Sequence, residues 1–374
     1  MTKMIYPGQT IGIIGGGQLG RMMALAAKEA GFKIAVLEPT MDSPCGQVAD
    51  VRIVGQYNDE AALEELADVS DVITYEFENI DYEGLKRLTK IAYVPQGAEL
   101  VRITQNRVTE KDAIVKAGCP VAPYVVVNTY EDLTEQIDKI GYPCIVKTAR
   151  GGYDGKGQQL LESYEDIPLA KSLVEHSQCV VEGFVPFKME ISCIVQRNGN
   201  GETYCLPVGE NIHVHHILHE TIVPARISVE TLKKAEDAAI KIADHLQLIG
   251  TLAVEMFVLE DGQIVINELA PRPHNSGHYS IEGCNISQFG QHIRAVCGWP
   301  LRKPKLMKPS IMVNVLGQHV VPLSNSISKY PEWSVHLYGK AEAKVNRKMG
   351  HVTIMTDNVK ETLEQIEKSG IWSE

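Results

Sequence analysis

The chain has 374 residues, long enough for two or three domains with ample cores. Its net charge of −11 excludes general nucleic-acid binding, which needs a cationic surface, and no apolar run approaches the roughly 20 residues that span a bilayer. The N-terminus has no apolar segment followed by a cleavage site, and none of the eight cysteines forms a C-x-x-C pair. We therefore expect a cytoplasmic protein with reduced cysteines that binds neither membranes nor nucleic acids.

The first hundred residues alternate between short apolar runs and segments with helical spacing. Strands are predicted at 10–16, 33–39 and 71–80, and helices at 18–31, 59–69 and 81–90. This alternation predicts a doubly wound parallel sheet, whose ligands bind at the carboxyl ends of the strands. The turn Gly15–Gly20, Glu38 and the segment Glu76–Glu78 should share that rim.

After about residue 105 the pattern changes. Helices are predicted at 108–118, 130–141 and 231–248, antiparallel strands around a loop at Asn198–Gly201, and a strand, turn and strand over 250–270. The tail after residue 310 shows two short strand-like segments and a final helix. We expect an α+β region here.

The N-terminal turn contains G-x-G-x-x-G at Gly15, Gly17 and Gly20, with an acidic residue, Glu38, at the end of the next predicted strand. Taken alone, this is the fingerprint of a dinucleotide site. Any anion can use the exposed N–H groups of a helix start, so the motif is weak. Nothing downstream supplies a dehydrogenase constellation.

The segment Gly151–Gly157 is a glycine-rich loop that follows a short strand ending near Lys147. Glycine exposes backbone N–H groups, which suits a loop that covers phosphates, and the lysine amine can reach a phosphate. The loop is not a Walker A motif. The alternative is a mobile hairpin with solvated lysines.

A hairpin around Asp261-Gly262 predicts a metal site. If these residues form a two-residue turn, Glu260 pairs with Gln263 and Glu255 lies opposite Glu268. Facing carboxylates repel each other unless a divalent cation lies between them, and Mg²⁺ prefers such oxygen ligands. The alternative is a register slipped by one residue, with both carboxylates in water.

Two further groups of side chains favour an anionic ligand. In "HVHHILH" we expect His213 and His215 on one face of a strand, as a sheet surface or nucleotide contact rather than a metal site. Arg272 follows the strand of Glu268 and should lie near a metal-bound phosphate. Lys340, Arg347 and Lys348 form a further cationic group. Because the chain is acidic overall, we expect these side chains to face the ligand cleft rather than to form a basic turn on the surface.

Together these residues resemble the ATP-grasp ligases. The resemblance extends to the 5-(carboxyamino)imidazole ribonucleotide synthases of purine biosynthesis, through "GGGQLGRM", "TYEFENI", "ARGGYDGKGQ", "EGFVPFKMEIS", "NELAPRPHNSGH" and "NRKMGH", which span nearly the whole chain. One departure is Asn346, where the last motif usually has glycine. The resemblance implies an α/β and α+β ATP-grasp fold: a Rossmann-like pre-ATP-grasp substrate domain at 1–105, a small lid domain at 106–190, and a C-terminal ATP-grasp domain at 191–374 with the Mg²⁺ site and a terminal substrate-binding segment.

The resemblance also implies the reaction. ATP phosphorylates bicarbonate, and carboxyphosphate or released CO₂ then carboxylates the exocyclic amine of aminoimidazole ribonucleotide, with release of ADP and phosphate. The N-terminal glycine-rich turn would bind the ribonucleotide rather than NAD, and the loop 149–158 would cover the triphosphate.

Site residues follow from the same resemblance. The ATP contacts implied are Arg107, Lys147, Gly152, Tyr153, Asp154, Gly155, Lys156, Gly157, Gln158, Glu182, Gly183, Phe184, Val185, Glu190, His213, Asn267 and Glu268. Glu190 would hold the ribose hydroxyls, and Glu182 with its neighbours the adenine edge. Glu255 and Glu268 would bind Mg²⁺. The ribonucleotide site would comprise Gln18, Leu19, Glu76, Tyr153, Lys340 and Arg347. Asp154 and Lys348 resemble the catalytic pair, and Arg272 the bicarbonate or phosphate clamp.

Other functions stay open at this point. The chain also fits another ATP-grasp ligase, such as a formate-dependent glycinamide ribonucleotide transformylase or a biotin carboxylase. From other classes, a Rossmann dehydrogenase or a non-catalytic nucleotide sensor are alternatives, although a sensor needs no acid–base pair. The family tendency predicts a homodimer whose other partners are small molecules only.

Overall fold

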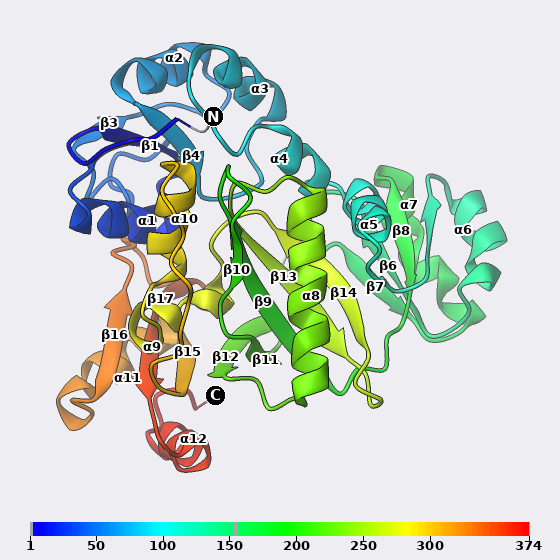
Figure 1. Cartoon of the computed structure of the whole chain (residues 1–374). Helices are drawn as coiled ribbons and strands as arrows, with labels where there is room; N and C mark the ends of the chain where they lie inside the picture. Colours follow the sequence, from blue (N-terminus) through cyan, green and yellow to red (C-terminus); the bar gives the residue numbers. More distant parts are fainter. Residues whose placement is uncertain (1–2, 153–155, 374) are drawn as a thin grey trace.

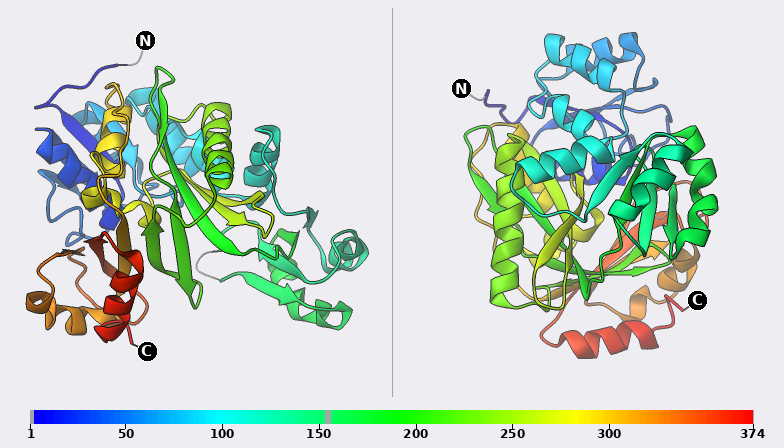
Figure 2. Two further views of the ribbon diagram at one scale, coloured as in Figure 1. Left: turned by 60° about the horizontal axis from the view of Figure 1, so that its bottom comes forward. Right: turned by 90° about the vertical axis from the view of Figure 1, so that its right-hand side faces the viewer.

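The computed structural model describes residues 3–152 and 156–373, which form three β-sheets (Figure 1). The predicted site residues Tyr153, Asp154 and Gly155 lie outside the described residues. The N-terminal sheet is at the top of Figure 1, the central sheet in the middle, and a small sheet at the right. In Figure 2 the small sheet projects from the rest of the molecule. No helix of the described residues is long and apolar enough to cross a membrane.

The N-terminal sheet is parallel, as predicted, with the order β3-β2-β1-β4. Its elements are β1 (Thr10–Ile14), α1 (Gln18–Glu29), β2 (Lys33–Leu37), β3 (Val51–Ile53), α2 (Glu60–Val69), β4 (Val72–Tyr75), α3 (Tyr82–Ile91) and α4 (Glu99–Thr104). Two helices start at aspartate N-caps, where Asp59 accepts from the N–H of Ala61 and Asp81 from that of Gly84. The sequence did not predict β3, because three residues are too few to show a period.

One face of this sheet is covered by a helix from far along the chain. Helix α10 (Gln288–Val296) packs beside α1, and Phe289 and Ile293 share one apolar cluster with Met23. Helices α2 and α3 cover the opposite face. A buried contact also joins α10 to β4, where His292 Nε2 lies 2.8 Å from Thr74 Oγ1. The N-terminal sheet is therefore completed by a later part of the chain.

The small sheet is antiparallel in the order β5-β8-β6-β7, and we call it the lid sheet. Its elements and the preceding helix are α5 (Arg107–Lys116), β5 (Tyr124–Val127), α6 (Tyr130–Gln136), η1 (Ile137–Lys139), β6 (Cys144–Thr148), β7 (Gln158–Leu161), η2 (Tyr164–Ala170), α7 (Lys171–His176) and β8 (Cys179–Gly183). The glycine-rich loop joins β6 to β7, so it extends from one edge of the lid sheet.

The central sheet has nine strands in the order β14-β13-β9-β11-β12-β15-β17-β16, with β10 beside β9. Its strands are β9 (Met189–Arg197), β10 (Thr203–Cys205), β11 (Gly209–Val214), β12 (Ile217–Val223), β13 (Gly250–Val258), β14 (Ile264–Ala270), β15 (Ser310–Leu316), β16 (Trp333–Leu337) and β17 (Lys348–Met355). The helical segments are α8 (Val229–His245), η3 (Asn275–Gly277), α9 (Ser280–Gly283), η4 (Gly317–His319), α11 (Val320–Ser324), η5 (Ile327–Lys329) and α12 (Val359–Lys368). Helix α8 buries an alanine-rich face, including Ala235 and Ala239, against β9 and β13.

Two sequence predictions about this sheet are wrong. The tail contributes three strands, not two, and they extend the central sheet. His215 does not share a strand face with His213, because His215 and His216 form the turn between β11 and β12 with φ of 50° and 64°. Positive φ at both central residues is typical of a two-residue hairpin turn whose twist matches the flanking strands.

Candidate active site

The carboxylates of Glu255 and Glu268 lie on neighbouring strands. Glu255 on β13 pairs with Glu268 on β14, as predicted. The route to this pairing differs from the prediction, because Leu259 N–H donates to Gln263 O (2.9 Å) and the loop therefore has three residues. A bulge at Asn267 then shifts the register by one residue and restores the pairing.

The surroundings of the two carboxylates differ. Glu255 Oε1 lies 3.0 Å from His274 Nε2, and although burial opposes ionisation, His274 and His213 lower the pKa of Glu255 to about 2. Glu268 Oε2 lies 3.4 Å from Arg107 Nη1, yet burial and the charge of Glu255 raise the pKa of Glu268. A cation between them would remove this repulsion, so the pair suits Mg²⁺.

Two carboxylates are a small ligand set. Among the residues that the structure describes, no group of three or more His, Cys, Asp or Glu side chains has a metal-binding arrangement. Mg²⁺ commonly takes only one or two carboxylates and completes its shell with phosphate oxygens and water. The two carboxylates therefore fit a Mg²⁺ ion that is also bound by the phosphates of a nucleoside triphosphate.

Three charged side chains meet between the lid sheet and α5. Lys147 Nζ on β6 lies 3.0 Å from Glu182 Oε2 on β8, and Lys111 Nζ on α5 lies 3.2 Å from Glu182 Oε1. Burial opposes the charge of Glu182, but the two lysines outweigh it and hold the pKa of this carboxyl below its usual value. Both oxygens of Glu182 therefore face lysines, so its side chain is engaged within the chain.

The remaining predicted nucleotide contacts lie on adjacent elements. His213 Nδ1 on β11 lies 3.2 Å from Glu190 Oε2 on β9. Phe184 and Val185 follow the end of β8, and Gln158 pairs with Lys147 across the lid hairpin. The described part of the glycine-rich loop has φ of 76° at Gly151 and 71° at Gly157, which glycine adopts readily.

Arg272 joins the central sheet to the N-terminal sheet. Its Nε donates to Glu78 Oε2 (2.6 Å) and its Nη2 to Glu78 Oε1 (3.3 Å), a two-pronged contact that fixes the guanidinium plane. The negative charges of Glu255 and Glu268 also stabilise the positive charge of Arg272. Burial opposes its charge, but Glu78, through its charge and its hydrogen bonds, raises the pKa of Arg272 above its ordinary value, with smaller contributions from Glu255 and Glu268.

The glycine-rich turn of the N-terminal sheet holds carboxylates of the chain itself. The N–H groups of Gly17 and Gly20 donate to the two oxygens of Glu76, at 2.5 and 2.6 Å. The N–H of Gly16 donates to Glu38 Oε2 (2.7 Å). In a dinucleotide fold these amides receive the pyrophosphate, so carboxylates in their place repel such a ligand. The geometry therefore disfavours the dehydrogenase alternative.

The predicted ribonucleotide residues surround this turn. Gln18 and Leu19 lie in the first turn of α1. Gln47 Nε2 donates to Gly339 O (2.8 Å) and so ties the N-terminal sheet to the loop that contains Lys340. Lys340 Nζ donates to Lys348 O (2.7 Å). Burial, Arg347 and Lys348 lower the pKa of Lys340 to about 8, while the charge of Glu76 opposes them.

Asn346 departs from the family motif without disturbing this loop. Its φ is 64°, the left-handed region that glycine favours and asparagine tolerates. Its N–H donates to Gln318 Oε1 (3.0 Å), and its Oδ1 accepts from Gln318 Nε2 (3.1 Å). Asn346 therefore adopts the backbone conformation that glycine favours, and its two hydrogen bonds with Gln318 stabilise the turn.

Three domain families match this chain. They are the ribonucleotide synthetase preATP-grasp domain at residues 8–105, the ATP-grasp domain at 112–289 and the phosphoribosylaminoimidazole carboxylase C-terminal domain at 310–365. The N5-carboxyaminoimidazole ribonucleotide synthase of Bacillus subtilis is 54% identical over 97% of this chain and 96% of its own length. That of Staphylococcus haemolyticus is 48% identical over 95% of both chains.

The chain belongs to the N5-carboxyaminoimidazole ribonucleotide synthase family. The solved structures agree. A crystal structure of such a synthetase in complex with ADP has a TM-score of 0.97 and 57% identity over 100% of this chain and 99% of its own. The Aspergillus clavatus synthase in complex with ADP and 5-aminoimidazole ribonucleotide has a TM-score of 0.91 and 31% identity over 98% of both chains. The predicted ATP-grasp fold and the membership in this ligase family are thus confirmed.

Sequence reasoning missed several partners in this synthase site. Lys111, Glu78 and His274 contact predicted site residues, and Glu110 Oε1 accepts the N–H of Leu269 (2.7 Å), the neighbour of Glu268 in the chain. The spacing of Arg107, Glu110 and Lys111 places them on one face of α5. This spacing could have identified Glu110 and Lys111 from the sequence, because they lie on the same helix face as Arg107, a predicted ATP contact.

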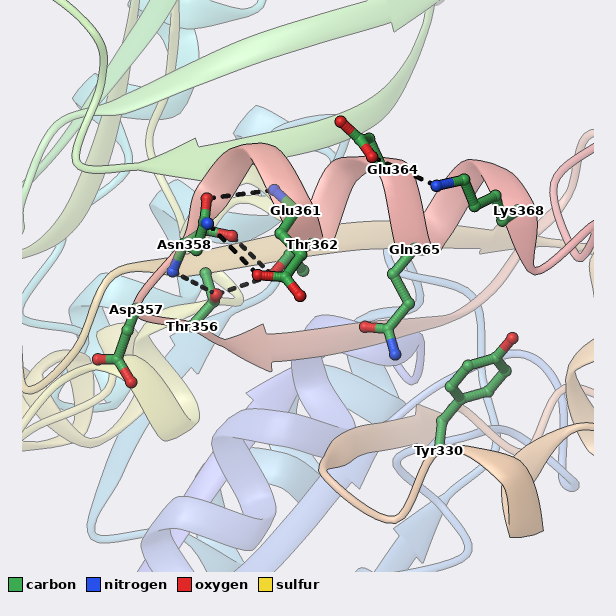
Figure 3. A pocket seen from close by; sticks show the side chains of 9 residues that line it. All are labelled: Tyr330, Thr356, Asp357, Asn358, Glu361, Thr362, Glu364, Gln365 and Lys368. Carbon is green, nitrogen blue, oxygen red and sulfur yellow. Dashed lines mark hydrogen bonds and ion pairs between the residues drawn. The ribbon is translucent and has the colours of Figure 1, made fainter.

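A hollow elsewhere on the synthase does not coincide with this chemistry. It has a volume of about 650 Å³. Figure 3 shows that several of its lining side chains come from α12. Its lining includes Asp357, Glu361 and Glu364, and its lysine, Lys368, pairs with Glu364 at 3.3 Å. None of its lining residues is a predicted site residue. Its acidic side chains make it unsuitable for a nucleotide phosphate.

Proposed function

We propose that this protein catalyses the ATP-dependent carboxylation of 5-aminoimidazole ribonucleotide with bicarbonate in purine biosynthesis. The γ-phosphoryl group of ATP passes to a bicarbonate oxygen, giving carboxyphosphate and ADP. The exocyclic amine then bonds to the carboxyl carbon, directly or after release of CO₂, while phosphate leaves and the amine loses a proton. The proposal rests on the family membership and on one observation above all, the Arg272–Glu78 contact that joins the two half-sites.

The nucleotide half-site lies between the lid sheet and the central sheet. We assign ATP phosphates to Arg107, Lys147 and the loop 152–158, and the nucleoside to the backbone of residues 182–185 and to Glu190 and His213, because both side-chain oxygens of Glu182 face lysines. Asn267 lies at the bulge beside the carboxylate pair. Glu255 and Glu268 would hold Mg²⁺, which neutralises phosphate charge when bound. Arg272, oriented by Glu78, would hold bicarbonate or the transferring phosphoryl group.

The ribonucleotide half-site lies at the rim of the N-terminal sheet. We assign the phosphate of the ribonucleotide to Lys340 and Arg347, and its ribose to Glu76 near Gln18 and Leu19. Each Glu76 oxygen that accepts one N–H keeps lone pairs for a further hydroxyl donor. Lys348 would act with Asp154, which lies outside the described residues, on the reacting amine.

We also propose three domains and a cytoplasmic homodimer. The first domain would be 1–105, and the second boundary is better placed between β8 and β9 than after residue 190, which lies inside β9. All eight cysteines lie in the described part of the chain and are unpaired, as expected in a reducing compartment. Light scattering on the purified protein tests the dimer.

A phosphate-release assay tests the function. ATP, bicarbonate and 5-aminoimidazole ribonucleotide are omitted one at a time, and formate with glycinamide ribonucleotide replaces the last two in a parallel reaction. We expect rapid phosphate release only with the three proposed substrates. Equal release with formate and glycinamide ribonucleotide would contradict the proposal.

A further inference from the structure

Lys111 is a buried lysine to which the proposed mechanism gives no role. Its side chain is 1% exposed, and it projects from α5 toward the lid sheet. Charged side chains are rarely buried so fully unless they are paired, because the ammonium group loses its hydration. Lys111 has one carboxylate partner, Glu182, at 3.2 Å, and its Nζ also lies 5.8 Å from the ring centre of Tyr124.

The two lysines around Glu182 are not equivalent. Lys111 is on the inner side, whereas Lys147 is 12% exposed and begins the approach to the glycine-rich loop. Each lysine faces a different oxygen of the same carboxylate. Two ammonium groups and one carboxylate leave one net positive charge, and the more exposed lysine is the one that a phosphate can approach.

We propose that Lys111 is a positioning residue for ATP, which neutralises Glu182 from the buried side so that Lys147 remains available to the nucleotide phosphates. This inference rests on the proposed function, because it assumes that Lys147 meets ATP. Without Lys111, Glu182 has Lys147 as its sole lysine partner among the described residues, and the net charge of the group falls to zero. The phosphates would then compete with Glu182 for one ammonium group.

A purely structural role makes a different prediction. If Lys111 only fastens α5 to the lid sheet, its loss should disturb the lid whatever residue is at position 182. If it balances the charge of Glu182, then Glu182→Gln should remove the need for it. The double variant Lys111→Met/Glu182→Gln therefore separates the two roles, and rescue is expected only for charge balance.

Calorimetric titration with Mg·ATP, without the second substrate, is the direct test. Lys111→Met should weaken ATP binding by about ten-fold or more, which corresponds to about 1.4 kcal/mol, because the phosphates must then compete with Glu182 for Lys147. The double variant should return to within about three-fold of wild type. The KM for 5-aminoimidazole ribonucleotide should stay unchanged. Lys116→Met is the matched control, because Lys116 is an exposed lysine on the same helix, paired with Asp112.

Two outcomes overturn the inference: ATP affinity within two-fold of wild type in Lys111→Met, or equal losses in the single and double variants. Should Lys111→Met fail to fold, the double variant decides, because it removes both partners of the buried ion pair: charge balance predicts ATP affinity within about three-fold of wild type, and a ten-fold loss contradicts it. Turnover of the wild-type protein with bicarbonate and the ribonucleotide is measured on the same preparation. A wild type that binds ATP without this turnover contradicts the proposed function rather than the role of Lys111.

Discussion

The ribonucleotide half-site should lose affinity for its substrate at alkaline pH because of Lys340. Burial, with the nearby charge of Arg347, lowers the pKa of this lysine to about 8. A lysine loses its charge as the pH rises through its pKa, so the shift moves this loss into the range from pH 7 to 9. The substrate phosphate is already a dianion there, since its second pKa is about 6.

The size of the effect follows from the titration. With a pKa of about 8, Lys340 is about nine-tenths charged at pH 7 and about one-tenth charged at pH 9. If the charged form alone binds the phosphate, kcat/KM for 5-aminoimidazole ribonucleotide falls about ten-fold over this range. This ratio is the correct measure, because its pH dependence reports groups of the free enzyme.

Steady-state rates at saturating ATP across pH 6.5–9.5 give the profile. Lys340→Arg is the matched variant, since guanidinium stays charged throughout, and its kcat/KM should remain nearly constant from pH 7 to 9. The kcat/KM for ATP serves as an internal reference and should change less from pH 7 to 9 than the kcat/KM for 5-aminoimidazole ribonucleotide. A wild-type profile that is flat, or an equal fall in Lys340→Arg, would refute the reasoning.

Three further predictions concern single groups. Glu268→Gln removes one of two facing carboxylates and should raise the Mg²⁺ concentration for half-maximal turnover at least about ten-fold; an unchanged Mg²⁺ titration would exclude the ligand role. Burial, with the charge of Glu268, raises the pKa of Glu110 to about 8, so the contribution of this carboxyl group to stability should fall as the pH rises from about 4.5 to 8. Glu110→Gln keeps an acceptor for the Leu269 N–H, and its free energy of unfolding should rise relative to that of wild type by up to about 1.4 kcal/mol per pH unit across that window. A difference in urea midpoints between the two proteins that does not change with pH would contradict this. Gly20→Ala places a methyl group 2.6 Å from Gly15 O and should cost about 1–3 kcal/mol, whereas an unchanged urea midpoint would show that the turn can relax.

Much of this protein was predictable from local patterns. Apart from β3 and α4, the strands and helices of the N-terminal sheet follow from residue periodicity and from aspartate caps, which act within a few residues. The facing of Glu255 and Glu268 was also predicted, since a hairpin fixes which residues oppose each other. Its derivation was wrong in detail, because a three-residue loop and a bulge at Asn267 compensate each other, and neither has a clear signal in the sequence.

Only the tertiary structure decided which charges meet. Arg272 and Glu78 are 194 positions apart, and Glu182 lies on a lid strand whose lysine partner Lys111 is on a helix outside that sheet. Helix α10 likewise completes a sheet that ends more than two hundred residues earlier. Such pairings have no period or spacing in the sequence, because the free energy that brings them together comes from burying apolar faces of separate elements. Local residue pattern determines the elements of this synthase, whereas the packing of its three sheets determines the charge balance of its active site.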